Sequence, residues 1–218
     1  MRVLFSKGIA ALSKPRCGST SLRRMLDPLL APGDIAVNTA TEARPYHPHI
    51  TAPYLKQLLA QAGHDPAALA WIITVRHPVD MLWSYWNFFK PDAGGRYSFM
   101  PRWDAASRMG FECWIDTGRL PANPAWAQLA PAWISSDDLS PLSLEYRAEH
   151  RDGGLAVDAV FRIEEPDRLA AWIAERTGQA VAVQHVNRSG AAGPPPLGQA
   201  ARDRIRTLLP RESALYGV

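Results

Sequence analysis

Two stretches of the sequence combine cations, hydroxyls and glycine in a way that suits the binding of phosphate or sulfate. The first begins at Lys14 and reads Lys-Pro-Arg-Cys-Gly-Ser-Thr-Ser-Leu. Three hydroxyl residues follow Gly18 and open a predicted helix, whose N-terminus offers backbone N–H groups and a partial positive charge. Glycine lets the backbone approach an anion closely, while Lys14 and Arg16 add full charges. We predict an anion-binding loop here; the alternative is an ordinary capped helix after a turn.

The second stretch runs from Arg76 through Pro78 to Ser84. Proline suits the first position of a helix, so Ser84 falls about two turns into the helix that follows. Together Arg76 and Ser84 can grip a second phosphate. The alternative is an exposed arginine before a helix that tolerates a serine.

Both stretches follow short apolar runs that predict β-strands, at residues 8–13 and 70–75. The second run, Ala-Trp-Ile-Ile-Thr-Val, is continuous rather than alternating, which is typical of a strand covered on both faces. The alternation of strands and helices predicts an α/β domain, a three-layer sandwich with a mainly parallel central sheet. Ligands bind such sheets at the carboxyl ends of strands, where both loops lie. Further predicted strands cover 34–39, 155–163 and 180–183, and predicted helices cover 19–30, 51–61, 79–89, 111–116, 167–177 and 199–209.

The composition is that of one globular domain, which we expect to cover residues 1–218. Hydrophobic residues make up 47% and charged residues 21%, and the formal net charge is +3, too small to indicate a nucleic-acid partner. The apolar runs are too short for a membrane helix, and the first residues do not resemble a signal peptide. The two cysteines, Cys17 and Cys113, form no disulfide framework and no zinc spacing. We therefore expect a cytoplasmic protein that binds neither nucleic acid nor membrane.

In their order and spacing, the two stretches resemble the sulfotransferases that use 3′-phosphoadenosine 5′-phosphosulfate (PAPS), most of all those that act on carbohydrates. Residues 15–22 resemble the family's 5′-phosphosulfate loop, which is P-loop-like but lacks the GxxxxGK[ST] pattern of nucleotide triphosphatases. Residues 76–85 resemble its 3′-phosphate element. Looser matches are the strand-Glu-helix segment at 161–165, the late loop at 187–190 and the ending at 209–217. Residues 92–155 match little, and we expect them to form an insertion or lid that binds the acceptor.

The resemblance implies transfer of a sulfuryl group from PAPS to a hydroxyl acceptor, either a small molecule or a saccharide, without a metal ion. It assigns the 5′-phosphosulfate to the first loop and the 3′-phosphate to the second, with the late loop closing over the nucleotide. The residues assigned to the nucleotide are Arg16, Cys17, Gly18, Ser19, Thr20, Ser21, Arg76, Ser84, Arg188, Ser189 and Gly190.

The same resemblance suggests the catalytic groups. Arg16 stands where many members have a catalytic lysine and others an arginine; it would stabilise the leaving oxygen, with Lys14 as the alternative. An arginine is a poor proton donor because its pKa exceeds ~12. Some relatives carry paired histidines near residues 46–50, so we expect His49, or else His47, to be the general base. Glu42 is the carboxylate alternative.

Two other functions fit parts of the pattern. A kinase-like phosphotransferase would need magnesium ligands and a lysine beside Gly18, and the sequence offers neither. A non-catalytic module that binds an adenosine phosphate would keep Arg76 and Ser84 but would need neither Arg16 nor a histidine base.

Overall fold

The computed structural model describes residues 1–38, 45–88, 110–117, 140–150, 152–183 and 193–218. Contacts divide the chain into two compact units, each made of two sequence segments. The sheet unit comprises Met1–Arg76 and Leu144–Gly190, and the helical unit comprises His77–Ser143 and Ala191–Val218. Each is described by itself. The prediction of a single domain, with an insertion at 92–155, stays a prediction; residues 92–109, 118–139 and 151 lie outside the described residues.

The sheet unit is built on a five-stranded mixed sheet in the order β3-β1-β2-β4-β5. Strand β2 is parallel to β4, and β4 is parallel to β5, whereas β1 is antiparallel to both β2 and β3. The chain therefore has the predicted α/β class, but the sheet is mixed rather than mainly parallel. The strands are β1 (Arg2–Leu4), β2 (Ile9–Ser13), β3 (Ile35–Ala36), β4 (Ala70–Val75) and β5 (Ala159–Arg162).

The sequence analysis missed β1, and its antiparallel direction follows from the connection to β2. Only one turn of 3-10 helix, Phe5–Lys7, joins the two strands, and Gly8 closes it in the left-handed conformation with φ 62°. A connection this short can join only antiparallel neighbours, because a parallel crossover needs a dozen or more residues.

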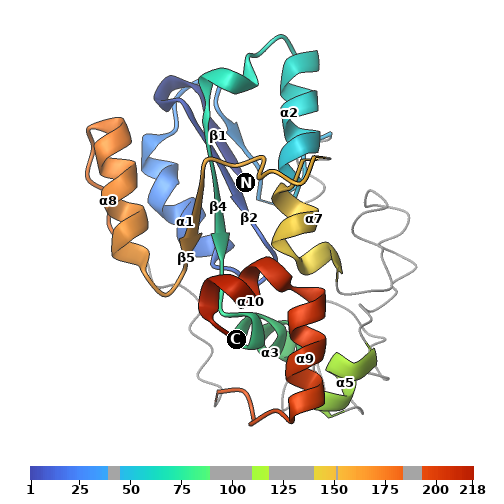
Figure 1. Ribbon diagram of the computed structural model, residues 1–218. Helices are drawn as coiled ribbons and strands as arrows, with labels where there is room; N and C mark the ends of the chain where they lie inside the picture. Colours follow the sequence, from blue (N-terminus) through green and yellow to red (C-terminus); the bar gives the residue numbers. More distant parts are fainter. Residues whose placement is uncertain (39–44, 89–109, 118–139, 151, 184–192) are drawn as a thin grey trace. The chain divides into compact units, whose positions relative to one another are not determined.

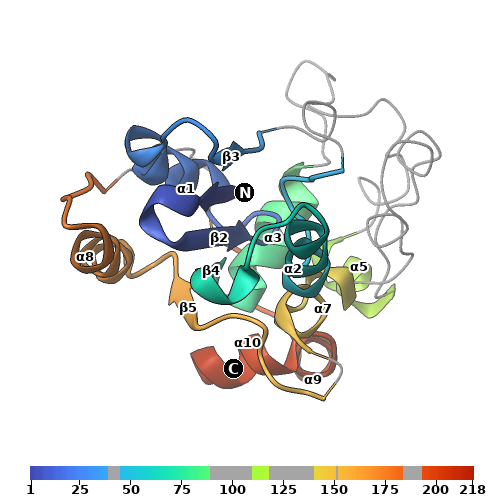
Figure 2. The ribbon, with the colours of Figure 1, turned by 90° about the horizontal axis from the view of Figure 1, so that it is seen from above.

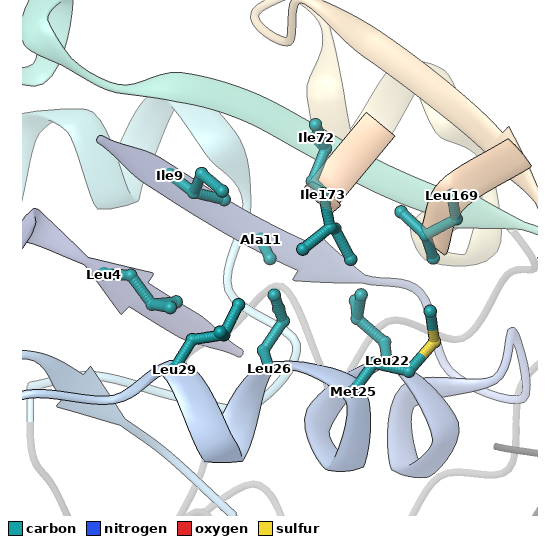
Figure 3. Close-up of a cluster of buried hydrophobic side chains, with 10 residues drawn as sticks. All are labelled: Leu4, Ile9, Ala11, Leu22, Met25, Leu26, Leu29, Ile72, Leu169 and Ile173. Atoms are coloured by element: carbon teal, nitrogen blue, oxygen red, sulfur yellow. The ribbon is translucent and has the colours of Figure 1, made fainter. Parts of the chain in front are cut away.

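Helices lie on both sides of this sheet, as Figures 1 and 2 show from two directions. Helices α1 (Ser19–Leu26) and α8 (Pro166–Thr177) lie on one side, and α2 (Ala52–Gln61) and α7 (Leu144–Ala148) lie on the other. The core on the first side is drawn in Figure 3. Ile9 and Ala11 of β2 both point toward α1 and α8. Because successive side chains of a strand point to opposite faces, Leu12 points toward α2 and α7. The ten buried side chains of this cluster are Leu4, Ile9, Ala11, Leu22, Met25, Leu26, Leu29, Ile72, Leu169 and Ile173.

The helical unit contains α3 (Pro78–Phe88), α5 (Phe111–Thr117), α9 (Gln199–Leu208) and α10 (Pro210–Tyr216). Aromatic side chains join α3 to α5. Trp83 and Trp86 stack with ring centroids 4.9 Å apart, and the Phe111 ring meets Trp83 edge-on at 5.0 Å. Trp86 and Phe111 are buried, whereas Trp83 is half-buried.

Most predicted elements are present, with shifted ends. Helix α1 ends at Leu26, and a 3-10 turn with Pro28 near its start, Asp27–Leu29, replaces its predicted last turn. The strand predicted at 180–183 is wrong, since 181–183 have no regular structure. Helices α7 and α10 were not predicted. Across the described ranges, every helix is too short or too polar to cross a lipid bilayer.

Candidate functional site

Two strand ends of the sheet unit place the first predicted loop beside the start of the second. Ser13 of β2 pairs in register with Thr74 of β4, so the chain leaves both parallel strands at the same edge. Lys14 is the first residue after β2, and Arg76 is the first residue after β4. The prediction that the two loops begin at one carboxyl edge of the sheet is confirmed.

The loop from Lys14 to Gly18 is compact and anchored to the neighbouring strand. The backbone N–H of Cys17 donates to the carbonyl of Lys14 at 3.3 Å, which closes a turn. The Thr74 hydroxyl donates to the carbonyl of Cys17 at 2.7 Å. Arg16 has φ 61°, the one left-handed residue other than glycine in the described chain. That conformation is unfavourable by roughly 1 kcal/mol or more, so the surrounding structure holds it in place.

Position 18 requires a glycine. Its φ is 70°, and a Cβ built on it would lie 2.9 Å from Cγ2 of Ile163. A β-branched side chain is stiff at χ1 and cannot easily turn away. The glycine therefore lets the first turn of α1 lie against the chain just after β5.

Helix α1 begins immediately after this loop, with Gly18 as its N-cap and no side-chain cap. The first helical bond runs from the N–H of Leu22 to the carbonyl of Gly18 at 2.9 Å. The N–H groups of Ser19, Thr20 and Ser21 precede it, at the positive end of the helix dipole. All three residues are half-buried. Their arrangement offers oriented N–H and hydroxyl donors to an oxyanion.

The two cationic side chains of the loop, Lys14 and Arg16, differ in their exposure to solvent. The Lys14 side chain is fully buried, with 0% exposure, and burial together with Arg147 lowers its pKa to about 8 against the opposing effects of Cys17 and Glu145. Arg16 is half-buried. Because the ammonium of Lys14 lies beneath the surface, Arg16 is the loop cation that a ligand can reach.

Cys17 is fully buried within the loop. Burial raises the pKa of its thiol, although the charges of Lys14 and Arg76 oppose the shift. The thiol is therefore protonated at neutral pH, which makes it a poor nucleophile. The influence of Arg76 on this thiol also locates Arg76 beside the loop.

His49 lies on the α2 and α7 side of the same strand end. Its Nδ1 is 3.0 Å from the carbonyl oxygen of Ser13. A carbonyl only accepts, so Nδ1 carries the proton and Nε2 is the basic atom of the neutral ring. Burial, and then Arg147 and His47, lower the pKa of this half-buried histidine to about 3, although its bond to Ser13 opposes the shift.

His47 has a different role in the same segment. It is 5% exposed, and its Nδ1 accepts the backbone N–H of His49 at 3.0 Å. Burial and the charge of Arg147 lower its pKa to about 4. Its lone pair at Nδ1 therefore holds the turn that carries His49, which leaves His49 as the better placed base of the two.

Arg147 and Glu145 of α7 complete this cluster and were missed by the sequence analysis. Arg147 is 3% exposed, and its Nη1 donates to the backbone carbonyl of His49. The negative charge of Glu145 opposes the lowering of the pKa of Lys14. No spacing pattern in Leu-Glu-Tyr-Arg-Ala marks this pair; a buried arginine in a five-residue helix becomes visible only in the fold.

The other predicted nucleotide residues are spread more widely. Arg76 is half-buried in the sheet unit, and Ser84, 9% exposed, belongs to α3 of the helical unit. Their joint grip on a 3′-phosphate stays a prediction. Arg188, Ser189, Gly190 and Glu42 lie outside the described residues. Within the described ranges, no group of three or more His, Cys, Asp or Glu side chains could hold a metal ion.

Comparisons with known proteins identify no similar protein. No protein-family profile, curated protein or solved structure matches it. The site has to be interpreted from its own residues.

Proposed function

We propose that the protein is a sulfotransferase that transfers a sulfuryl group from PAPS to a hydroxyl acceptor, either a small molecule or a saccharide. The observation that carries the proposal is the loop after β2. It runs from a strand end through left-handed Arg16 and Gly18 into the N-terminus of α1, and Arg76 leaves the adjacent parallel strand beside it. We further propose that the domain is a three-layer α/β sandwich of the P-loop-like kind that this family has.

The donor groups of the loop fit the 5′ end of such a nucleotide. Arg16, Gly18, Ser19, Thr20 and Ser21 supply one cation, several N–H groups and three hydroxyls, which suit the oxygens of a phosphosulfate. Arg76, with Ser84, would hold the 3′-phosphate that distinguishes this donor from ATP. Arg188, Ser189 and Gly190 would cover the nucleotide.

When bound, PAPS supplies a sulfuryl group on a phosphate leaving group, and the reaction is an in-line displacement at sulfur. The bond from sulfur to the acceptor oxygen forms as the bond to the bridging oxygen breaks. Arg16 and the N–H groups at the start of α1 stabilise the charge on the departing phosphate. His49 takes the acceptor's proton at Nε2. Lys14 contributes a positive potential from beneath the loop rather than direct contact.

The low pKa of His49, about 3, describes the protein without an anion. Arg147 and the other positive groups nearby disfavour a second positive charge on the ring. A bound nucleotide adds several negative charges at the loop and favours the protonated imidazole. His49 therefore becomes a stronger base when the donor is bound.

Calorimetry tests the nucleotide assignment. We expect the desulfated product, PAP, to bind and ATP to bind much more weakly, because only PAP carries the 3′-phosphate. Arg16→Ala should weaken PAP binding, whereas Arg24→Ala should not, since Arg24 is an exposed residue near the end of α1. Equal affinity for ATP and PAP would favour the kinase-like alternative. Unchanged PAP binding in Arg76→Ala would remove the 3′-phosphate assignment.

A transfer assay separates catalysis from mere binding. Radiolabelled sulfate is followed from PAPS to a panel of hydroxylated acceptors that includes saccharides. We expect Arg16→Ala and His49→Ala to abolish transfer and Arg24→Ala to retain it. If the parent protein binds PAP but transfers sulfate to no acceptor, the non-catalytic module is the better description.

We also propose that the activity is cytoplasmic. Cys17 and Cys113 are both free thiols, in keeping with a reducing compartment. Fractionation of the native cells tests this directly, and recovery of the protein outside the cytoplasm would contradict it.

A further inference from the structure

Three hydrogen bonds fix the segment that carries His49. The carbonyl of Ser13 accepts from Nδ1 of the ring at 3.0 Å, and Nδ1 of His47 accepts the backbone N–H of His49 at 3.0 Å. The third bond comes from Arg147, whose Nη1 donates to the backbone carbonyl of His49. The ring, the backbone N–H and the backbone carbonyl of His49 are therefore each hydrogen-bonded to a different residue.

The third bond spans 98 positions of the sequence and joins the loop before α2 to helix α7. Arg147 is 3% exposed and points its charge into the strand-end cluster rather than into solvent. Burying a guanidinium is unfavourable unless it is well hydrogen-bonded. The burial of Arg147 therefore indicates that its hydrogen bonds serve a specific purpose. A simple packing position would be filled more favourably by an apolar side chain.

We propose that Arg147 is a positioning residue for His49, holding its backbone so that the ring keeps Nδ1 on Ser13 and presents Nε2 as the proton acceptor. The inference rests on the proposed function, in which His49 is the general base. Arg147 lies within residues 92–155, the part of the sequence that shows little resemblance to the sulfotransferase family.

The charged and titratable groups around His49 come from every element of the cluster. Lys14 follows β2, His47 lies in the same loop, Arg147 and Glu145 belong to α7, and the terminal amine of Met1 also contributes. Arg147 acts on His49 in two ways, because it bonds the backbone and because its charge disfavours the imidazolium. Removing it should therefore change both the orientation and the titration of the ring.

Nuclear magnetic resonance tests the proposal without any substrate. With ¹⁵N-labelled histidine, the parent protein should show His49 as the Nδ1–H tautomer, neutral well below pH 6. In Arg147→Met the ring should take a mixture of tautomers and titrate at a higher pH. Arg147→Lys, which keeps a charge and a donor, should restore most of the parent behaviour. Arg168→Met is the matched control, since Arg168 is 74% exposed and forms its ion pair with Glu165 on the exposed surface of α8.

Kinetics with PAPS and an acceptor give the second readout. We expect Arg147→Met to lower kcat about 10- to 100-fold, the size of effect seen when a residue that orients a metal ligand is lost, with little change in the KM for PAPS. The acid limb of its kcat/KM profile should move to higher pH, which a loss of stability alone would not cause. Arg147→Lys should recover most of the rate.

The two proposals fail in different ways. If Arg147→Met folds and leaves the His49 tautomer, the titration and kcat unchanged, the positioning role is wrong even though the parent transfers sulfate. If the parent transfers no sulfate while the His49 resonances still respond to Arg147→Met as expected, the positioning stands and the sulfotransferase assignment fails. Should Arg147→Met not fold, Arg147→Lys and Arg147→Gln, which differ in charge and both retain a donor, carry the same comparison.

Discussion

Gly18 connects the loop to α1 at a point where two constraints meet, a left-handed backbone and the side chain of Ile163. Gly18→Ala should destabilise the protein by about 1–3 kcal/mol, because it adds both backbone strain and a clash with a stiff side chain. It should also weaken PAP binding by displacing the first turn of α1. Chemical denaturation and calorimetry measure the two effects.

Gly33→Ala is the control for this substitution. Gly33 also has a positive φ, 89°, but a Cβ there would have no neighbour within 4 Å. We expect it to show the strain alone and to leave PAP binding intact. The double variant Gly18→Ala with Ile163→Ala should regain binding. Equal losses of stability and binding in the two single variants would show that the contact with Ile163 is unimportant.

His47 makes the stability of the protein depend on pH. Its pKa falls from 6.5 in the unfolded chain to about 4 in the fold, so below pH 6.5 the unfolded state takes up a proton that the folded state refuses. Stability is therefore lost as the pH falls from 6.5 toward 4, by about 2 kcal/mol at pH 5 for this one residue. Protonation at Nδ1 also breaks its bond to the N–H of His49.

His47→Gln tests this dependence, because a glutamine oxygen can accept the same bond but does not titrate. Denaturation curves at pH 7.5 and pH 5 should differ less in His47→Gln than in the parent. His49 adds a loss of its own in this range and keeps the difference from vanishing. His64→Gln, at an exposed histidine, should behave as the parent does. An unchanged difference in His47→Gln would refute the assignment.

Residue types and spacing were enough to single out Arg16 and Gly18 as candidates, and the resemblance to PAPS-dependent sulfotransferases added His47 and His49. They did not reveal that Lys14 is fully buried while Arg16 is reachable, because burial depends on how α2 and α7 cover β2. Arg147 carried no local signal at all. Its role depends on a carbonyl 98 positions earlier in the chain.

At the scale of elements, Thr74 of β4 ties the loop that follows the neighbouring strand β2 to the sheet. It is the hydroxyl residue within β4, and its Oγ1 donates to the carbonyl of Cys17. Thr74→Val keeps the shape and removes the bond, so we expect a loss of about 1 kcal/mol in stability. We also expect weaker PAP binding, because the loop would lose its anchor.

Thr177→Val provides the comparison. Thr177, at the far end of α8 from the loop, also donates from its hydroxyl to a carbonyl, that of Ile173 at 2.7 Å, and accepts the backbone N–H of Gln179. It should lose similar stability and keep full affinity for PAP by calorimetry. If Thr74→Val also keeps full affinity, the anchor does not matter for the ligand.

Elements with a strong local pattern were predictable, and those that depend on partners were not. The continuous apolar run of β4 was found to the residue, and α8 ends before Gly178 as expected, with φ 68° at the glycine. Strand β1 has only three residues and exists because β2 and β3 pair with both of its edges. Residues 180–183 have strand-like composition, yet no strand forms there.

At the scale of the whole molecule, the sheet unit is assembled from two distant segments. Strand β5 pairs with β4 in register from Ile72↔Ala159 onward, although the chain between them makes the excursion through His77–Ser143. Most of the order of strands and helices was readable from the sequence, because the longer elements follow from a local period, whereas β1, α7 and α10 were missed. The division into two units was not, since it depends on which distant segments meet.

This organisation shapes the effect that a nucleotide should have on thermal unfolding. A ligand that binds only the folded state stabilises it by about 2.7 kcal/mol at 100 times its Kd, which for a chain of this size raises Tm by about 5–10 °C. If the two units unfold in separate steps, PAP should raise the transition of the sheet unit, which holds β2, the loop and α1. Differential scanning calorimetry shows whether the two units unfold together or in separate steps.

ATP at the same concentration should raise Tm much less than PAP does. Arg16→Ala should reduce the rise in Tm with PAP, while Arg24→Ala should preserve it. A rise in Tm that is equal for ATP and PAP, or unaffected by Arg16→Ala, would mean that the nucleotide binds somewhere other than this loop.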